Sequence, residues 1–410
     1  MAAQPVDAVD VLREHLRRYP ADRQPLQHAT AQFHLGGALL QQGGLDEAEA
    51  CYSIAAAVFA ARGAYAEQAK ALNGLGATLR AADRLDLAVR ALQHAAAGLA
   101  EAGLSLEEGA ARCNLGVVLR ESGHPRAAAD ALERARALLD PAKVPAQAAT
   151  AARELGTTRL ELGELAAAQA SLTEAIDLAD RSGDQAGLGA AANALGLSWL
   201  ADGRPVEAAE AFHTATQANP RGIRPREFAM AKANLGYAYE RAHEPARARL
   251  AARQALSPPG VAVPVRAQAA GVLKRLGANS SDLRAVLEAD SPEARPALVR
   301  EELTRSADAD AAGRAIDMRA WIEAITASAL DPADVAELWL GGLLELPPDR
   351  LEALASAAVV ACDGIDAEVR ESFREAVVRG MVRFHVPQWM RLQDTFSQAA
   401  DAVGDPGPWR

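Results

Sequence analysis

The chain has 410 residues, of which half are apolar and only 4% are aromatic, and its formal net charge is −11. This acidic balance argues against a general nucleic-acid binder, because such proteins gain affinity by neutralising phosphates. Local basic patches remain open, since 43 basic residues are present and all but four are arginine. Alanine, the best helix former, is abundant, which favours tightly packed helices.

Nothing in the sequence indicates export or membrane insertion. Cys51, Cys113 and Cys362 are scattered and odd in number, as in a reduced, cytoplasmic protein without a disulfide framework or a zinc knuckle. Residues 1–10 carry acids and lack the apolar core of a signal peptide. No apolar run approaches the roughly 20 residues that span a bilayer. We expect a cytoplasmic protein with no membrane and no nucleic acid among its partners.

The first predicted element is a helix over residues 6–19. It places Ala8 and Leu12 forty residues before Ala48 and Tyr52, and this spacing continues along the chain. A Leu-Gly pair recurs six times at the same spacing, at 35–36, 75–76, 115–116, 155–156, 195–196 and 235–236. Alanine columns start at Ala31, Ala48 and Ala55 and keep the same register through six copies. A period in this range is typical of an α-solenoid.

Each forty-residue unit is predicted to form two helices, which in the first unit cover 25–41 and 45–61. Gly43 and Gly44 break the chain between them. In later units Pro125, Pro205 and Pro245 fall in the first turn of the second helix, where a missing N–H costs nothing.

Two further features follow from the repeat pattern. Asp184 and Ser105 stand where the first helix of a unit should be capped. The columns of small residues indicate helix crossings that are too close for a large side chain. Leucine at Ala88 or Ala168 would overpack such a crossing by about 1–3 kcal/mol.

The pattern over residues 21–258 resembles the tetratricopeptide repeat (TPR). Gly36, Ala48 and Ala55 match that family's small positions, and Tyr52 and its equivalents match its large one. The tryptophan of the family is absent, and forty residues per unit exceed its usual 34 or so, as in the long repeats of kinesin light chain and its relatives. The resemblance implies an all-α, right-handed solenoid of six hairpins, with residues 1–20 as a capping helix. In the sixth unit Ala252 replaces the large residue, so we expect looser packing there.

Beyond the repeats the chain stays helical. Residues 259–290 are predicted to form a degenerate seventh unit that begins near Leu276–Gly277, one residue out of register. Residues 291–410 are predicted to form a C-terminal helical bundle, with helices over 331–346, 349–362, 366–384 and 388–403. We expect Trp339 and Trp389 in its core and Trp409 in a frayed tail.

The sequence offers little catalytic chemistry. It contains no phosphate-binding loop, no HExxH and no GxSxG motif. His28 and His34 are six residues apart and so lie on different helix faces, and Asp308 with Asp310 is typical of a solvated helix start. We therefore assign no catalytic residue, no metal ligand and no cofactor.

The TPR resemblance implies a docking surface instead, because the first helices of TPR units line a concave groove. The residues at the groove registers are Lys70, Asn73, Arg80, Asn114, Arg120, Thr150, Arg153, Thr157, Asn193, Asn234 and Tyr237. In long-repeat TPRs the asparagine of an Asn-Leu-Gly step holds the backbone of an extended peptide, and Asn114 and Asn234 occupy that step. Asn73 and Asn193 lie one residue earlier.

The polar groups of this groove have competing interpretations. An amide both donates and accepts, so asparagines can pair with any peptide backbone, while Arg80, Arg120 and Arg153 would select acidic groups. Alternatively, the asparagines bond between neighbouring helices, and the arginines are solvated or pair with Glu121, Glu154 and Glu161.

Three functions are compatible with the sequence. The leading hypothesis is a non-catalytic scaffold or adaptor that binds an extended segment or helix of a partner protein in the groove. The second is a regulatory sensor, in which a peptide or ligand changes the pitch of the solenoid and thereby the exposure of the bundle. The third is an all-helical enzyme or biosynthetic accessory protein, with a pocket between the last repeats and residues 291–410 that contains a perturbed carboxylate or His385. Neither the partner nor the oligomeric state follows from the sequence.

Overall fold

The computed structural model describes residues 8–405 and 409, and every regular element in this part of the chain is an α-helix. The helices fall into two compact units, Met1–Arg204 and Pro205–Arg410. The helices of the first unit are α1 (Ala8–Arg18), α2 (Pro25–Gln42), α3 (Leu45–Ala61), α4 (Tyr65–Ala81), α5 (Leu85–Glu101), α6 (Ser105–Glu121), α7 (Pro125–Leu138), α8 (Pro145–Glu161), α9 (Leu165–Ser182) and α10 (Gln185–Ala201).

The second unit continues with helices of 8 to 18 residues. They are α11 (Pro205–Ala218), α12 (Pro225–Arg241), α13 (Pro245–Leu256), α14 (Val263–Leu276), α15 (Asp282–Ala289), α16 (Arg295–Asp308), α17 (Ala311–Thr326), α18 (Pro332–Leu344), α19 (Pro348–Ala361), α20 (Ala367–Met381) and α21 (Val386–Val403).

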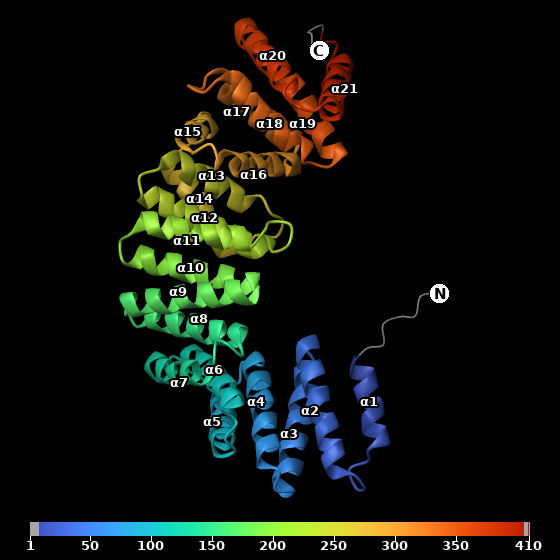
Figure 1. The fold of residues 1–410 in the computed structure, drawn as a ribbon, viewed down its shortest axis with the longest axis vertical. Helices are drawn as coiled ribbons and strands as arrows, with labels where there is room; N and C mark the ends of the chain where they lie inside the picture. The colour runs from blue at the N-terminus through green and yellow to red at the C-terminus, as the bar shows by residue number, and fades with distance from the viewer. Residues whose placement is uncertain (1–7, 406–408, 410) are drawn as a thin grey trace. The chain divides into compact units, whose positions relative to one another are not determined.

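In the first unit the helices pack in chain order, each against the next, as Figure 1 shows. The even-numbered helices from α2 to α10 also contact one another in succession. These helices begin at Pro25, Tyr65, Ser105, Pro145 and Gln185, which are forty residues apart. The predicted all-α solenoid of sequential helix pairs is thus confirmed, and the forty-residue period sets where each helix begins.

The turns between helices explain the glycines of the repeat. Seven of them, from Gly43 to Gly203, have φ between 69° and 80°, a conformation that residues with a Cβ rarely adopt. Asp83 and His243 stand at the register of Gly43 in two other forty-residue repeats, with φ of 58° and 61°. Asp184 caps α10 as predicted, by accepting a hydrogen bond from the Gly187 backbone N–H. The cap predicted for Ser105 is wrong, because Leu104 is the N-cap and Ser105 is already helical.

The crossing of α6 and α7 shows why the small residues recur. A Cβ added to Gly116 would overlap the branched end of Leu132, which is fully buried. Gly76 meets Leu92 and Gly156 meets Leu172 in the same way. In each helix pair of the first unit, a large side chain of the second helix therefore packs directly on the backbone of a glycine in the first helix.

In the second unit α12 and α13 form an equivalent pair without the large side chain. A Cβ on Gly236 would meet the Ala248 carbonyl oxygen at 3.1 Å and the Ala252 nitrogen at 3.2 Å. Ala252 is fully buried at this crossing. The loose packing expected at this position is therefore not observed.

The next helices differ from the predicted seventh unit in detail. Helix α14 packs on α12 and α13, but it ends at Leu276, and Gly277 follows it as the C-cap. The Leu276–Gly277 step, expected near the start of a degenerate unit, thus closes a helix. Helix α15 is held to α13 by a buried ion pair in which Arg249 Nη2 lies 2.7 Å from Asp282.

The C-terminal helices pack by a different rule. From α15 to α21 each helix contacts the next but one along the chain: α15 with α17, α16 with α18, and so on to α21. Their shared core contains the aromatic rings of Trp321, Trp339, Phe373 and Phe396, all almost fully buried. Trp339 is a core residue as predicted, and Trp389 packs against the core while partly buried.

Trp409 belongs to this core, and the prediction of a frayed tail at this position is wrong. Its ring is 1% exposed and stacks on Phe396 with centroids 5.3 Å apart. Its indole nitrogen donates to Asp405, which also pairs with Arg374. The Gly/Pro composition of the segment suggested disorder, but the Trp409 ring packs against Phe373 and Phe396, and burial of a large aromatic ring is stabilising.

The remaining C-terminal helices lie close to their predicted ranges. Asp331 and Asp366 cap α18 and α20 through their side chains. The predicted domain boundaries after residues 20, 258 and 290 stay predictions, as does the assignment of residues 291–410 to a separate domain. None of the described helices is both long enough and apolar enough to cross a membrane.

A pair of glycine variants tests the crossing. We expect Gly116→Ala to lower the free energy of unfolding by about 1–3 kcal/mol, because Leu132 must leave its rotamer or the helices must separate. Gly222 has no atom within 4 Å of an added Cβ, so Gly222→Ala is the matched control and should change stability by less than about 0.5 kcal/mol. Denaturant titration followed by circular dichroism measures both, and equal effects would contradict the crossing model.

Candidate functional site

The predicted groove residues of the first unit lie on its even-numbered helices, whose common surface we call the A-helix face (α2, α4, α6, α8 and α10). Lys70, Asn73 and Arg80 come from α4, Asn114 and Arg120 from α6, Thr150, Arg153 and Thr157 from α8, and Asn193 from α10. Arg80 is exposed, whereas Asn193 is buried and the others are half-buried. They recur at a few registers of the forty-residue repeat: Asn73, Arg153 and Asn193 share one of these registers, and Arg80 and Arg120 share another.

Two of the asparagines bond to each other across the face. Asn114 Nδ2 donates to Asn73 Oδ1 at 3.0 Å, joining α6 to α4. This is the local bond of the alternative interpretation. It uses one group of each amide, so among the described residues the Asn73 NH₂ and the Asn114 carbonyl oxygen keep free bonding capacity.

The arginines form ion pairs between successive forty-residue repeats of the first unit. Arg80 Nε and Nη2 donate to Glu121 at 2.9 and 3.0 Å. Arg120 bridges Glu154 at 3.1 Å and Glu161 at 3.0 Å. The bond to Glu121 raises the pKa of Arg80. These positive charges are largely neutralised within the chain, which weakens the argument that they select acidic ligands.

Lys70 differs from the arginines, because no ion pair joins it to any described residue. It is half-buried on α4, one helical turn from Asn73. The A-helix face therefore presents one unneutralised cation beside the asparagine pair.

A hollow of about 260 Å³ opens on the same face between α8 and α10. Its lining combines small residues with the polar side chains of Thr150, Arg153 and Asp184. The Thr150 and Thr157 hydroxyls donate to carbonyl oxygens of their own helix, so they have no donor left for a ligand. Arg153 pairs with Glu154 at 2.8 Å.

The last two predicted groove residues belong to the second unit. Asn234 is buried on α12 and accepts a hydrogen bond from Gln268 of α14 at 2.9 Å. Tyr237, on the same helix, is half-buried, and its hydroxyl accepts from Arg241 at 3.2 Å. Both side chains are engaged within the second unit.

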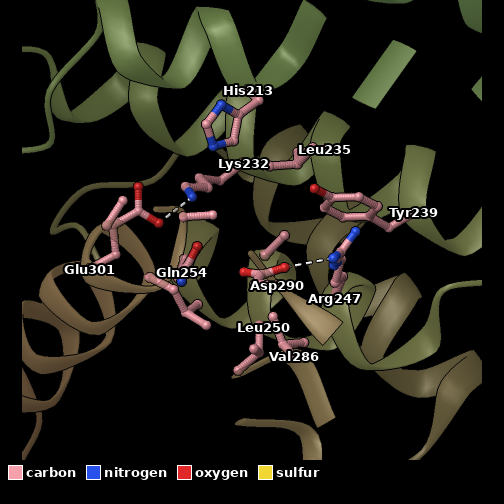
Figure 2. A pocket seen from close by; sticks show the side chains of 14 residues that line it. His213, Lys232, Leu235, Tyr239, Arg247, Leu250, Gln254, Val286, Asp290 and Glu301 are labelled. Atoms are coloured by element: carbon pink, nitrogen blue, oxygen red, sulfur yellow. Dashed lines mark hydrogen bonds and ion pairs between the residues drawn. The ribbon is translucent and has the colours of Figure 1, made fainter. Parts of the chain in front are cut away.

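The second unit also contains a pocket that the sequence did not identify (Figure 2). Its volume is about 100 Å³. It is lined by His213, Lys232, Leu235, Tyr239, Arg247, Leu250, Ala251, Gln254, Val286, Asp290, Ala294, Ala297, Leu298 and Glu301. Side chains from α11, α12, α13, α15 and α16 meet here, so no local motif marks the site.

Two ion pairs stand on opposite sides of this pocket. Lys232 Nζ lies 2.5 Å from Glu301, and Arg247 lies 2.6 Å from Asp290. Burial and then the nearby Lys232 charge lower the pKa of His213. Burial raises the pKa of the Tyr239 hydroxyl. His213 is therefore neutral, and Tyr239 protonated, near neutral pH.

One sequence signal could have indicated this pocket. Lys232 follows Ala231 of an alanine column, and the other units have Gln32, Leu72, Arg112, Ala152 and Ala192 at its register. Only Lys232 and Arg112 carry a charge at this register, and a charge beside this buried column needs a partner because burying a charge is costly.

The residues that raised the question of chemistry have structural roles. His385 is exposed and precedes α21 as its N-cap, and it is not part of the pocket lining. Asp310 caps α17, and Asp308 pairs with Arg221 and Arg350. Burial raises the pKa of the Cys113 thiol to about 12. Within residues 8–405 and 409, no three His, Cys, Asp or Glu side chains are grouped so as to hold a metal ion.

The bridging arginine of the A-helix face gives a test of its structural role. We expect Arg120→Met to lower the free energy of unfolding by about 1–3 kcal/mol, because Glu154 is buried and keeps only Arg153 as an ionic partner. Arg136→Met removes a more exposed pair with Glu174 and should cost less than about 1 kcal/mol. Similar shifts of the denaturation midpoint in both variants would show that Arg120 does not bridge successive forty-residue repeats.

Comparison with known proteins agrees with this architecture. The first unit is an α-helical repeat array, and residues 67–140 match the family model of the tetratricopeptide repeat. The chain therefore contains tetratricopeptide repeats. No curated protein matches it significantly in sequence.

Several solved structures resemble parts of the chain. YrrB, described as a TPR protein with an unusual peptide-binding site, is 18% identical over 52% of this chain and 94% of its own, with a TM-score of 0.37. A putative kinesin light chain of Podospora anserina with nearly identical TPR-like repeats is 16% identical over 50% and 94%, with a TM-score of 0.39. BtubC (BKLC) from P. vanneervenii is 16% identical over 64% and 91%, with a TM-score of 0.36.

Proposed function

We propose that the protein is a non-catalytic scaffold that binds an extended segment of a partner protein on the A-helix face of its first unit. The Asn73–Asn114 pair carries the proposal. Its two amides hold each other in place, and each keeps one group, a donor on Asn73 and an acceptor on Asn114, that this bond does not use. A peptide backbone needs this combination and presents it whatever its side chains are.

The neighbouring side chains define the ligand further. Because Arg80 and Arg120 are paired with glutamates, the acidic preference of the partner depends on Lys70. The hollow beside Thr150 and Arg153 could accept one side chain of the bound segment. The expected ligand is an extended peptide with one acidic residue near Lys70.

The stacked helices also suit this function for an entropic reason. The polar side chains of the A-helix face are held by bonds between successive forty-residue repeats, so they lose little conformational freedom when a flexible segment binds. The cytoplasmic location and the absence of catalysis remain predictions from the sequence.

A display experiment tests the proposed surface. Peptides that bind the full chain would be selected from a random library, and their affinities measured by fluorescence anisotropy. We expect Asn73→Ala combined with Asn114→Ala to weaken the selected peptides roughly tenfold, because both free amide groups are lost. The control combines Arg90→Ala with His94→Ala on the exposed face of α5 and should leave affinity unchanged.

Circular dichroism of the variants would verify that their helices are intact. The proposal fails if the asparagine variant binds the selected peptides as well as the control does. It also fails if the selected peptides bind only at the exposed face of α5, so that the control variant loses affinity for them.

A further inference from the structure

The pocket of the second unit contains an ammonium group that the chain leaves incompletely bonded. The Lys232 side chain is only 5% exposed, although lysine is almost never buried without partners. Its Nζ makes one hydrogen bond, to Glu301, and lies 5.6 Å from the centre of the Phe228 ring. An ammonium carries three hydrogens, so two find no acceptor among the described residues.

Two other side chains that line the pocket have unused polar groups. The side chains of His213 and Tyr239 make no hydrogen bond to any described residue. Figure 2 shows the His213 ring above Lys232 and the Tyr239 hydroxyl directed into the pocket from the right of the view. Both can donate to a ligand oxygen, since the imidazole and the phenol are both uncharged donors near neutral pH.

Each of the two carboxylates of the pocket is paired with a cation. Glu301 is bonded to Lys232, and Asp290 is bonded to Arg247 at 2.6 Å. The groups without such a counter-charge are the two remaining hydrogens of Lys232 and the neutral donors of His213 and Tyr239, and together they suit an acceptor with negative charge.

The rest of the pocket is apolar and small. Leu235, Leu250, Val286 and Leu298 supply its hydrocarbon surface. A volume of about 100 Å³ is somewhat less than the roughly 150 Å³ of an engineered cavity that holds benzene. A ligand of about six heavy atoms, with one charged end and a short branched tail, matches these dimensions.

We propose that this pocket binds a small carboxylate, with its oxygens on Lys232, His213 and Tyr239 and its hydrocarbon part against Leu250 and Val286. The ligand is either a free short-chain carboxylate or the carboxyl-terminal residue of a peptide, because both present the same group. The site is independent of the A-helix face.

The test is a titration of the full chain with isobutyrate, observed by ligand-detected NMR. Isobutyramide has the same shape without the charge, and we expect it to bind at least roughly tenfold more weakly. A short peptide ending in valine, with a free or an amidated carboxyl terminus, then distinguishes the two sources. Displacement of isobutyrate by the free form alone assigns the peptide terminus, and no displacement by either form assigns the free carboxylate.

Two variants are expected to change the affinity for isobutyrate in opposite directions. Lys232→Met should weaken binding roughly tenfold or more, because the charged donor is lost. Glu301→Gln should tighten it about threefold, because the ammonium loses the anion that competes for it. Since Glu301→Gln keeps a hydrogen-bond acceptor for Lys232, this variant remains informative if Lys232→Met fails to fold.

Tyr239→Phe is a third variant and should weaken isobutyrate a few-fold without a change in net charge. The proposal is overturned if isobutyrate shows no saturable binding, if isobutyramide binds as well as isobutyrate, or if Glu301→Gln weakens the binding of isobutyrate.

Discussion

The close approach of helix backbones at each crossing is the constraint on which the repeat array depends. At the α6–α7 crossing the Leu132 side chain lies where a Cβ of Gly116 would be, so no larger residue fits without movement. Close packing of this kind tolerates little change in volume. Because the same fit recurs every forty residues, successive helix pairs are forced into equivalent positions. The polar side chains then return to one face.

Polar side chains also form contacts between neighbouring forty-residue repeats. Asn114 bonds to Asn73, and Arg120 bonds to Glu161, each across about one repeat. Such bonds fix the side chains of the A-helix face before any ligand arrives. In the second unit the contact of α13 with α15 and α16 is also polar, through Arg249–Asp282 and Gln254–Glu302. Lys232 of α12, next to this contact, has Glu301 as its only hydrogen-bond partner among the described residues.

Much of the fold could be predicted, because periodic small residues and prolines act locally. Helix α3 covers its predicted range, and Pro125 and Pro205 begin helices as expected. The errors concern effects that are not local. Trp409 is placed by rings distant in sequence, and its flanking glycine and prolines gave the opposite indication.

The candidate site was predictable only in part, for the same physical reason. The register of the repeat placed Asn73 and Asn114 on one face, but the choice between bonding to each other and bonding to a ligand depends on distances between helices. The pocket around Lys232 was missed because five helices contribute to it, including α15 and α16, which lie outside the repeat pattern.

The most direct test of the repeat constraint is the insertion of one additional unit. A second copy of residues 105–144, inserted after residue 144, adds one complete helix pair in register. Far-UV circular dichroism should then show an unchanged ellipticity per residue, with a denaturation midpoint at least as high as that of the parent chain, because each unit is stabilised by its neighbours. A loss of helicity, or a lower midpoint, would contradict the claim that closely fitted crossings at constant spacing determine the fold.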